Sequence, residues 1–244
     1  MKAEQLQLGL RPRPMYEAAD LGVRMAQDGV ASLRRAYLPF AVVLVVACGS
    51  TIELASWLPS LLLWWLKPWL DRALLHVYAR QVFGESTGFA EAWTARGRSP
   101  WSQMLWLLSF GRLSPWRSYA MPVAQLEGQS GLARRQRLQA MLRGHRGSAM
   151  MMQAAFSWVE AFLMVGLLSL GAWLAPGLHS FDTFKRLFDG DLFGEVALFG
   201  AYACAVLFVE PFFVAAGFAM YLNRRVELEA WDIEQDLRHA FAKA

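Results

Sequence analysis

The chain has 244 residues, a formal net charge of +4 and 56% hydrophobic residues, including 11 Trp and 16 Phe. Soluble proteins average about 45 to 50% apolar residues, so this composition argues against an ordinary soluble domain. The two cysteines, Cys48 and Cys204, lie in separate apolar runs outside any Cys-rich motif, so we predict neither a disulfide framework nor a zinc site.

The first predicted element is a helix over residues 15 to 35, with apolar residues at loosely helical spacing and an interruption near Gly29. We interpret it as an amphipathic helix lying on a membrane. The alternative is an ordinary soluble helix. Because the residues before it are polar, without the pattern of a cleavable signal peptide, we expect the first span to act as the insertion signal.

Residues 36 to 80 are predicted to contain two membrane spans. Crossing a bilayer takes about 20 mostly apolar residues, and residues 36 to 55 meet that length. The second candidate, residues 57 to 78, turns from apolar to mixed at Lys67 and Pro68. Because proline removes a backbone donor, we expect a bend there, after which the helix runs along protein or the membrane interface. Its polar residues recur at helical spacing: Asp71, Arg72 and His76.

Residues 84 to 147 are predicted to lie on the cytoplasmic face. Residues 101 to 127 are apolar but carry Arg112 and Arg117, each costing about 2.5 to 3.5 kcal/mol at the centre of a span. We therefore expect two short helices in a shallow hairpin. The basic segment that follows contributes candidate contacts to lipid headgroups or a partner: Arg134, Arg135, Arg137, Arg143 and Arg146.

The last two spans are predicted within residues 150 to 222. Small residues at 215 to 217 permit close helix approach. Arg224 and Arg225 are expected to end the last span at the headgroups, followed by an amphipathic helix over residues 224 to 244 with Trp231 at the interface. Its acidity favours a protein partner, or the basic segment, as its counterpart.

Glu160 and Glu210 fall near the middle of the last two spans, where an acid is costly and faces protein or water. Each is a candidate functional residue, with Asp71, Arg72 or His76 as possible companions. The alternative is a packing role, in which both acids pair with arginine, histidine or serine on neighbouring helices and fix the bundle. We favour packing, because two acids without a further polar lining make a poor pathway.

The charge pattern predicts orientation. Lysine and arginine concentrate before the first span, in residues 80 to 147 and after the last span, whereas residues 176 to 195 are acidic. By the positive-inside rule, four spans with both termini in the cytoplasm satisfy every bias, provided that residues 101 to 127 do not cross. Metalloprotease, hydrolase, nucleotide-binding and dinucleotide-binding motifs do not occur in the sequence, so we predict no enzyme activity and no cofactor. The arginines beside the spans favour anionic lipid over nucleic acid.

Three stretches resemble a family of uncharacterised bacterial multi-pass inner-membrane proteins: WWLKPWLDRALLHVYARQVFGE, RLSPWRSYAMPVAQLEG followed by RRQRL, and EPFFVAAGFAMYLNRRVELEAWDIE. Members are often encoded beside MoxR-type AAA+ ATPases, which implies a component of an envelope-associated assembly system. The expectation is therefore an all-α polytopic inner-membrane protein that acts as a non-enzymatic scaffold and docks membrane or cytoplasmic-face proteins, including a MoxR-type ATPase. The alternative is a small transporter or lipid-handling protein that uses Glu160 and Glu210.

Overall fold

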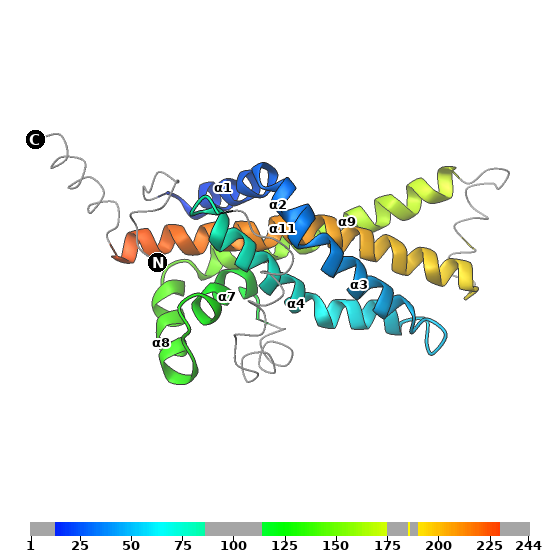
Figure 1. The fold of residues 1–244 in the computed structure, drawn as a ribbon, viewed down its shortest axis with the longest axis horizontal. Coiled ribbons are helices and arrows are strands. Elements are labelled where there is room, and N and C mark those ends of the chain that lie inside the picture. The colour runs from blue at the N-terminus through cyan, green and yellow to red at the C-terminus, as the bar shows by residue number, and fades with distance from the viewer. Residues whose placement is uncertain (1–12, 86–113, 175–184, 186–189, 230–244) are drawn as a thin grey trace, which may run out of the picture.

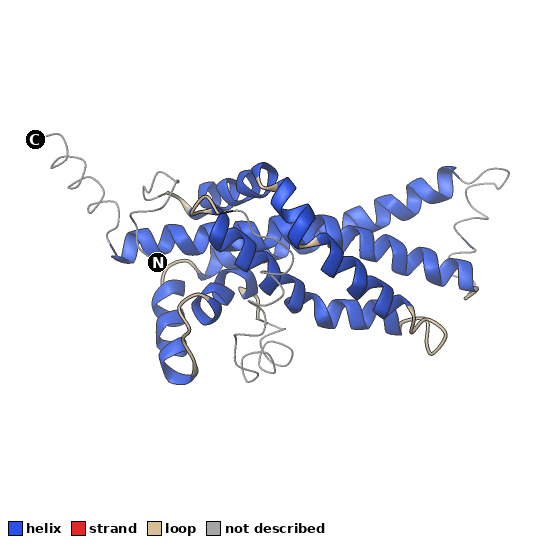
Figure 2. Cartoon of the chain, viewed as in Figure 1, coloured by secondary structure: helices blue, strands red, loops and turns tan. Residues whose placement is uncertain are grey.

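The structure, a computed structural model, describes residues 13–85, 114–174, 185 and 190–229. These residues form helices joined by turns and loops, with no strand among them, as Figure 2 shows. This confirms the predicted all-α fold. In chain order the helices are α1 (Met15–Asp28), α2 (Val30–Ala36), α3 (Leu38–Gly49), α4 (Leu58–Gln81), α7 (Arg117–Gln125), α8 (Gly131–Leu142), α9 (Arg146–Leu174) and α11 (Leu192–Glu229).

The fold is organised around α11, whose 38 residues give a rod about 57 Å long at 1.5 Å per residue. Helices α1, α4, α7 and α9 pack on it (Figure 1). Residues 209–222 of α11 are almost entirely buried among these helices, whereas Phe193, Val196 and Phe208 nearer its start are exposed. One helix therefore has a solvent- or lipid-facing first half and a protein-covered second half.

Small residues of α11 allow α1 and α7 to approach closely. A Cβ placed on Gly22 of α1 would lie 2.6 Å from the backbone carbonyl carbon of Ala215 and 2.7 Å from Cα of Ala216. A Cβ on Gly217 would lie 2.6 Å from Cβ of Ser118 in α7. All three separations are shorter than a van der Waals contact, so the close approach predicted for residues 215 to 217 is confirmed.

Two helices are long and apolar enough to cross a membrane, α9 with 29 residues and α11 with 38. The most apolar stretch of α9 contains no buried residue. The first predicted span, residues 36 to 55, is shorter than expected: α3 has 12 residues, or about 18 Å, against a hydrocarbon core of about 30 Å. The second, α4, has 24 residues but includes Lys67, Asp71, Arg72 and Arg80. By length and composition the described chain thus contains two candidate spans, where the sequence predicted four.

The N-terminal helix and α4 find partners within the protein. The helix expected over residues 15 to 35 is divided at Gly29, as predicted, but α1 buries Met15, Ala18 and Gly22 against α11 instead of keeping that face for a membrane surface. Helix α4 continues through Pro68, and its second half is buried. Of the two predicted courses for this half, along protein or along the membrane interface, the structure shows the first.

Two other segments differ from their predicted form. Residues 101–113, the first half of the expected hairpin, lie outside the described residues. The second half forms α7, which is buried from Arg117 to Val123 and thus lies inside the bundle. The helix predicted after Arg224 and Arg225 is continuous with the last span: α11 runs through both arginines to Glu229, because arginine, leucine and glutamate are all good helix formers. The remainder of the predicted tail helix, residues 230–244, lies outside the described residues.

Candidate functional site

Five charged side chains from four helices meet inside the bundle. Lys67 and Asp71 are one helical turn apart on α4, which places them on the same face. Arg117 is the first residue of α7, Glu160 lies midway along α9, and Glu210 lies where α11 becomes buried. We call these five residues the interior cluster.

The interior cluster is a continuous chain of ion pairs. Nζ of Lys67 lies 2.6 Å from Oε2 of Glu160 and 2.7 Å from Oε2 of Glu210. On the other side of Glu210, Nη2 of Arg117 donates to Oε1 at 3.1 Å and lies 3.1 Å from Oδ2 of Asp71. Glu210 therefore joins the lysine to the arginine and is the central residue of the chain.

Burial makes the pairing necessary. The side chains of Asp71 and Glu210 are 1% exposed and that of Arg117 is 4% exposed. An unpaired charge at such depth carries a desolvation penalty of several kcal/mol, which an opposite charge at hydrogen-bond distance offsets. The cluster therefore fixes the relative positions of α4, α7, α9 and α11.

A cavity of about 430 Å³ adjoins the interior cluster. Lys67, Arg117, Glu160 and Glu210 line one part of it. The remaining wall is mixed, with aromatic, aliphatic and uncharged polar side chains: Trp64, Ser114, Pro115, Gln153, Phe156, Ser157, Ala161, Met164, Tyr202, Val209 and Phe213. The site thus combines charged groups with a partly apolar wall, in a volume large enough for a small organic group.

Three members of the cluster were candidates from the sequence. Glu160 and Glu210 were candidates because each interrupts an apolar run, and Asp71 was a possible companion at helical spacing with Arg72 and His76. The structure brings the three acids together. Arg72 and His76, proposed with them, lie further along α4: Arg72 is buried, and its main-chain carbonyl accepts a hydrogen bond from Gln125 at 2.8 Å. His76 is half-buried.

Both cations of the cluster were missed as site residues. Lys67 was treated as the point where the second span loses its apolar character, and Arg117 as a reason why residues 101 to 127 do not cross. The available signal was the same one that identified the acids, a single charge within an apolar stretch. Applied to both signs of charge, it would have yielded candidate partners for Glu160 and Glu210.

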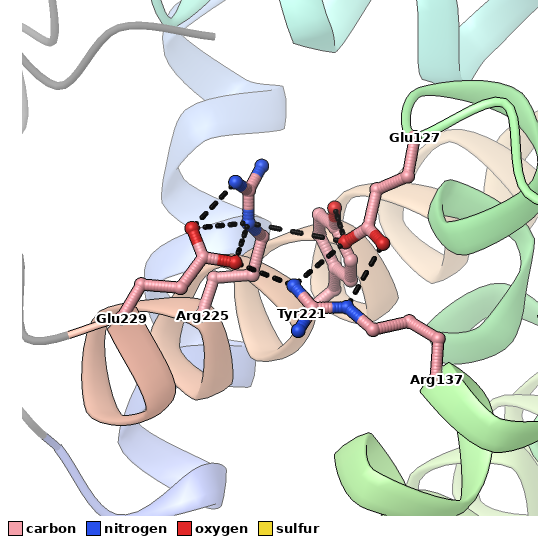
Figure 3. A network of polar contacts seen from close by, with 5 residues as sticks. All are labelled: Glu127, Arg137, Tyr221, Arg225 and Glu229. Carbon is pink, nitrogen blue, oxygen red and sulfur yellow. Dashed lines mark hydrogen bonds and ion pairs between the residues drawn. The ribbon is translucent and has the colours of Figure 1, made fainter.

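A second group of charges lies at the far end of α11 (Figure 3). It comprises Glu127, Arg137, Tyr221, Arg225 and Glu229, which we call the terminal network. Arg137 of α8 donates to Glu127 at 2.9 and 3.1 Å and also to Glu229. Arg225 donates to Glu229 at 2.6 Å, and the Tyr221 hydroxyl donates to Glu127 at 2.7 Å. The basic segment therefore pairs with the acidic end of α11 through Arg137 and Glu229. This was one of the two predicted counterparts, the other being a separate protein.

Hydrogen bonding sets the charge states in the terminal network. The hydrogen bonds to Glu127 raise the pKa of the Arg137 guanidinium above its ordinary value, against the opposite effect of burial. Burial would raise the pKa of Glu229, but the hydrogen bonds from Arg225 and Arg137 outweigh it and lower that pKa below its ordinary value. Both groups are held in their charged forms.

The other arginines predicted to contact lipid or a partner divide into two sets. Arg224 pairs with Glu227 at 2.6 Å and so is committed within the chain. Arg134 is half-buried, whereas Arg135, Arg143 and Arg146 are exposed around the α8–α9 turn. Trp231 lies outside the described residues.

No three His, Cys, Asp or Glu side chains of the described residues are grouped to hold a metal ion. Comparison of the chain with models of known families, with curated proteins and with solved structures finds no match. The geometry of the two charged groups and of the cavity is therefore the basis for assigning a function.

Proposed function

We propose that the chain is an integral protein of the bacterial inner membrane with four spans and cytoplasmic termini. Support comes from the arrangement of the helix ends. The α3–α4 turn, the end of α9 and the start of α11 lie at one end of the molecule, and α1, α7 and α8 lie toward the other (Figure 1). The exposed arginines at 135, 143 and 146 belong to the second end, which the positive-inside rule assigns to the cytoplasm.

In this topology, α3 and the first half of α4 form a hairpin beside the longer α9 and α11. Exposed apolar side chains on these helices form the lipid-facing surface, among them Val43, Val46, Trp65, Phe162 and Val165. Helix α3 follows α2 with only Tyr37 between them, and Arg34 and Arg35 in the last turn of α2 mark the cytoplasmic boundary of this hairpin.

Cysteine labelling tests this topology. Cys48→Ala and Cys204→Ala remove the native thiols, and single cysteines are placed at Ser56, in the α3–α4 turn, or at Ser130, before α8; both are exposed. In intact spheroplasts an impermeant maleimide should label Ser56→Cys only, and permeabilisation should expose Ser130→Cys. Labelling of Ser130→Cys in sealed spheroplasts would overturn the proposed orientation.

The function we propose within this topology is that of a non-enzymatic scaffold. One observation carries it: the charged side chains of the interior cluster pair with one another and lock four helices together, whereas arginines at the cytoplasmic end remain exposed. A rigid bundle that presents a basic surface is suited to docking an acidic protein surface or anionic lipid. The resemblance noted from the sequence makes a MoxR-type AAA+ ATPase the first partner to test.

Binding of a purified MoxR-type ATPase to liposomes that contain the protein tests the scaffold. Replacing Arg135 and Arg143 by Gln removes two exposed positive charges and should weaken binding, because rim charges steer association. The matched control replaces Gln136 and Gln139 by Glu; it makes the same change in net charge on exposed positions of α8 but retains both arginines. Equal loss with the control, or no binding by the wild type, would contradict arginine-specific docking.

A second candidate function, lipid or solute handling, is favoured by the cavity beside the interior cluster. Under this alternative Glu160→Gln and Glu210→Gln abolish activity in a correctly assembled protein, whereas a scaffold loses stability at most. Proton uptake into proteoliposomes, measured with an entrapped pH-sensitive dye, separates the two. Uptake by the wild type that both variants lack would favour the second candidate.

A further inference from the structure

The cavity beside the interior cluster contains hydrogen-bond donors that no described residue uses. Nε and Nη1 of Arg117 and the hydroxyl of Tyr202 are buried without a hydrogen-bond partner among the described residues, and so is one acceptor, Oε1 of Gln153. All three side chains line the cavity. Buried donors in native proteins are nearly always satisfied, and a guanidinium is best satisfied by an anionic oxygen group such as a phosphate. The cavity wall is therefore prepared for an acceptor-rich group.

The balance of charge limits what that group can belong to. The wall presents two cations, Lys67 and Arg117, and two carboxylates, Glu160 and Glu210, while Asp71 adds a third acid beside Arg117. A ligand with a net negative charge would meet this acidic excess. A ligand that carries its own positive group avoids that penalty, and Glu160 is the acid best placed to receive it: its side chain is 17% exposed, against 1% for Glu210.

The uncharged part of the wall indicates an amphiphile. Phe156 and Phe213 pack edge to face, and the guanidinium of Arg117 lies 5.3 Å from the Phe213 ring. The wall on α9 also includes Ser157, Ala161 and Met164, and the other exposed side chains between positions 158 and 168 of this helix are apolar. A polar group bound at Arg117 would therefore have apolar protein surface along α9 for attached hydrocarbon.

We propose that this cavity binds the zwitterionic headgroup of a phospholipid, with its phosphate accepting hydrogen bonds from Arg117 and Tyr202 and its ammonium group paired with Glu160. The acyl chains lie along the exposed apolar side of α9. This proposal rests on the proposed membrane location, because the lipid reaches the cavity from the bilayer. It assigns the cavity a ligand whether or not the protein moves that ligand.

Native mass spectrometry of the full chain in detergent tests the proposal with three probes: dioleoyl phosphatidylethanolamine, dioleoyl phosphatidylglycerol and soluble phosphoethanolamine. Because Arg117 also holds the bundle together, the decisive variants fill the cavity and leave the cluster intact. Ala161→Phe and Ser157→Phe enlarge lining residues that are exposed on α9. Ala155→Phe places the same side chain at an exposed position of α9 away from the lining, as a control.

The wild type and Ala155→Phe should retain phosphatidylethanolamine, and both cavity variants should retain about tenfold less, because the added ring occupies the space of the headgroup. Equal retention by all variants would overturn the site. Preference for phosphatidylglycerol would contradict recognition of a zwitterionic headgroup. Equally strong binding of soluble phosphoethanolamine would contradict the proposed contact with the acyl chains. Alkaline carbonate extraction of cell membranes separates failure of the proposed membrane location from failure of the proposed lipid site. Release of the protein by carbonate contradicts the membrane location. Retention of the protein, together with unselective lipid binding, contradicts only the lipid site.

Discussion

The interior cluster and the terminal network both include residues of α11 and both consist mainly of ion pairs, yet they differ in exposure. The acids of the interior cluster at 71 and 210 are 1% exposed, whereas Arg137 and Glu229 of the terminal network are each 26% exposed. A buried ion pair replaces lost hydration, so the loss of one member leaves an uncompensated charge. In a partly exposed pair, water can replace the lost partner. The two groups therefore differ in what happens when they are broken.

The largest expected effect comes from breaking the interior cluster. Arg117→Met removes the cation beside the buried carboxylate of Asp71 and should destabilise the fold by about 3 to 5 kcal/mol. Thermal unfolding in detergent, followed by circular dichroism, measures it. Arg146→Met, at an exposed arginine of α9, is the control and should have little effect. Adding Asp71→Leu to Arg117→Met should recover part of the loss. A single variant as stable as the wild type would remove the distinction between the two groups.

The stretch of α11 between the two groups provides the next test, because packing and not charge holds it. Gly22→Ala introduces a Cβ against the backbone of Ala215 and Ala216 and should cost about 1 to 3 kcal/mol through overpacking. Gly166→Ala in α9 meets nothing within 4 Å and should be neutral or stabilising, because alanine favours helix by about 1 kcal/mol over glycine. Equal behaviour of the two variants in thermal unfolding would contradict the close approach of α1 and α11.

Breaking the terminal network should have a smaller effect. Arg137→Gln removes the pairs with Glu127 and Glu229, which are partly hydrated, and should cost about 1 kcal/mol. Raising the salt concentration should shrink the difference from the wild type, since screening acts mainly on exposed charges. Thermal unfolding at two ionic strengths measures both quantities. A cost equal to that of Arg117→Met would show that exposure does not separate the two groups.

The smallest expected effect is a dependence on pH. Because the folded-state pKa of Glu229 lies below its ordinary value of 4.5, its charged form stabilises the fold at pH above that value. The contribution is lost as the pH falls through the lowered folded-state pKa. The difference in Tm between the wild type and Glu229→Ala should therefore be constant from pH 7 to about pH 5 and shrink in more acidic solution. A difference that grows on acidification would contradict the sign.

What could be predicted from the sequence depended on whether a feature is local. Apolar runs, small residues at 215 to 217 and single acids in apolar stretches are local, and they located the helices, the close approach to α11 and three members of the interior cluster. The partners of those acids are not local: Lys67 and Glu160 are separated by 93 positions, and so are Arg117 and Glu210. That the last span and the helix after it form one continuous helix was not predicted, since arginine marks a headgroup boundary without interrupting helical hydrogen bonding.

The position of α1 also determines when, during synthesis of the chain, this helix can pack. The Arg13 backbone N–H donates to the Asn223 side chain at 2.9 Å, across 210 positions of the chain. At a synthesis rate of about 5 to 20 residues per second, the ribosome needs roughly 10 to 40 s to reach that partner after α1 has emerged. Throughout that time the apolar face of α1 has no α11 to cover it. The first of the described helices is therefore among the last to be placed, and its apolar face needs protection in the interval.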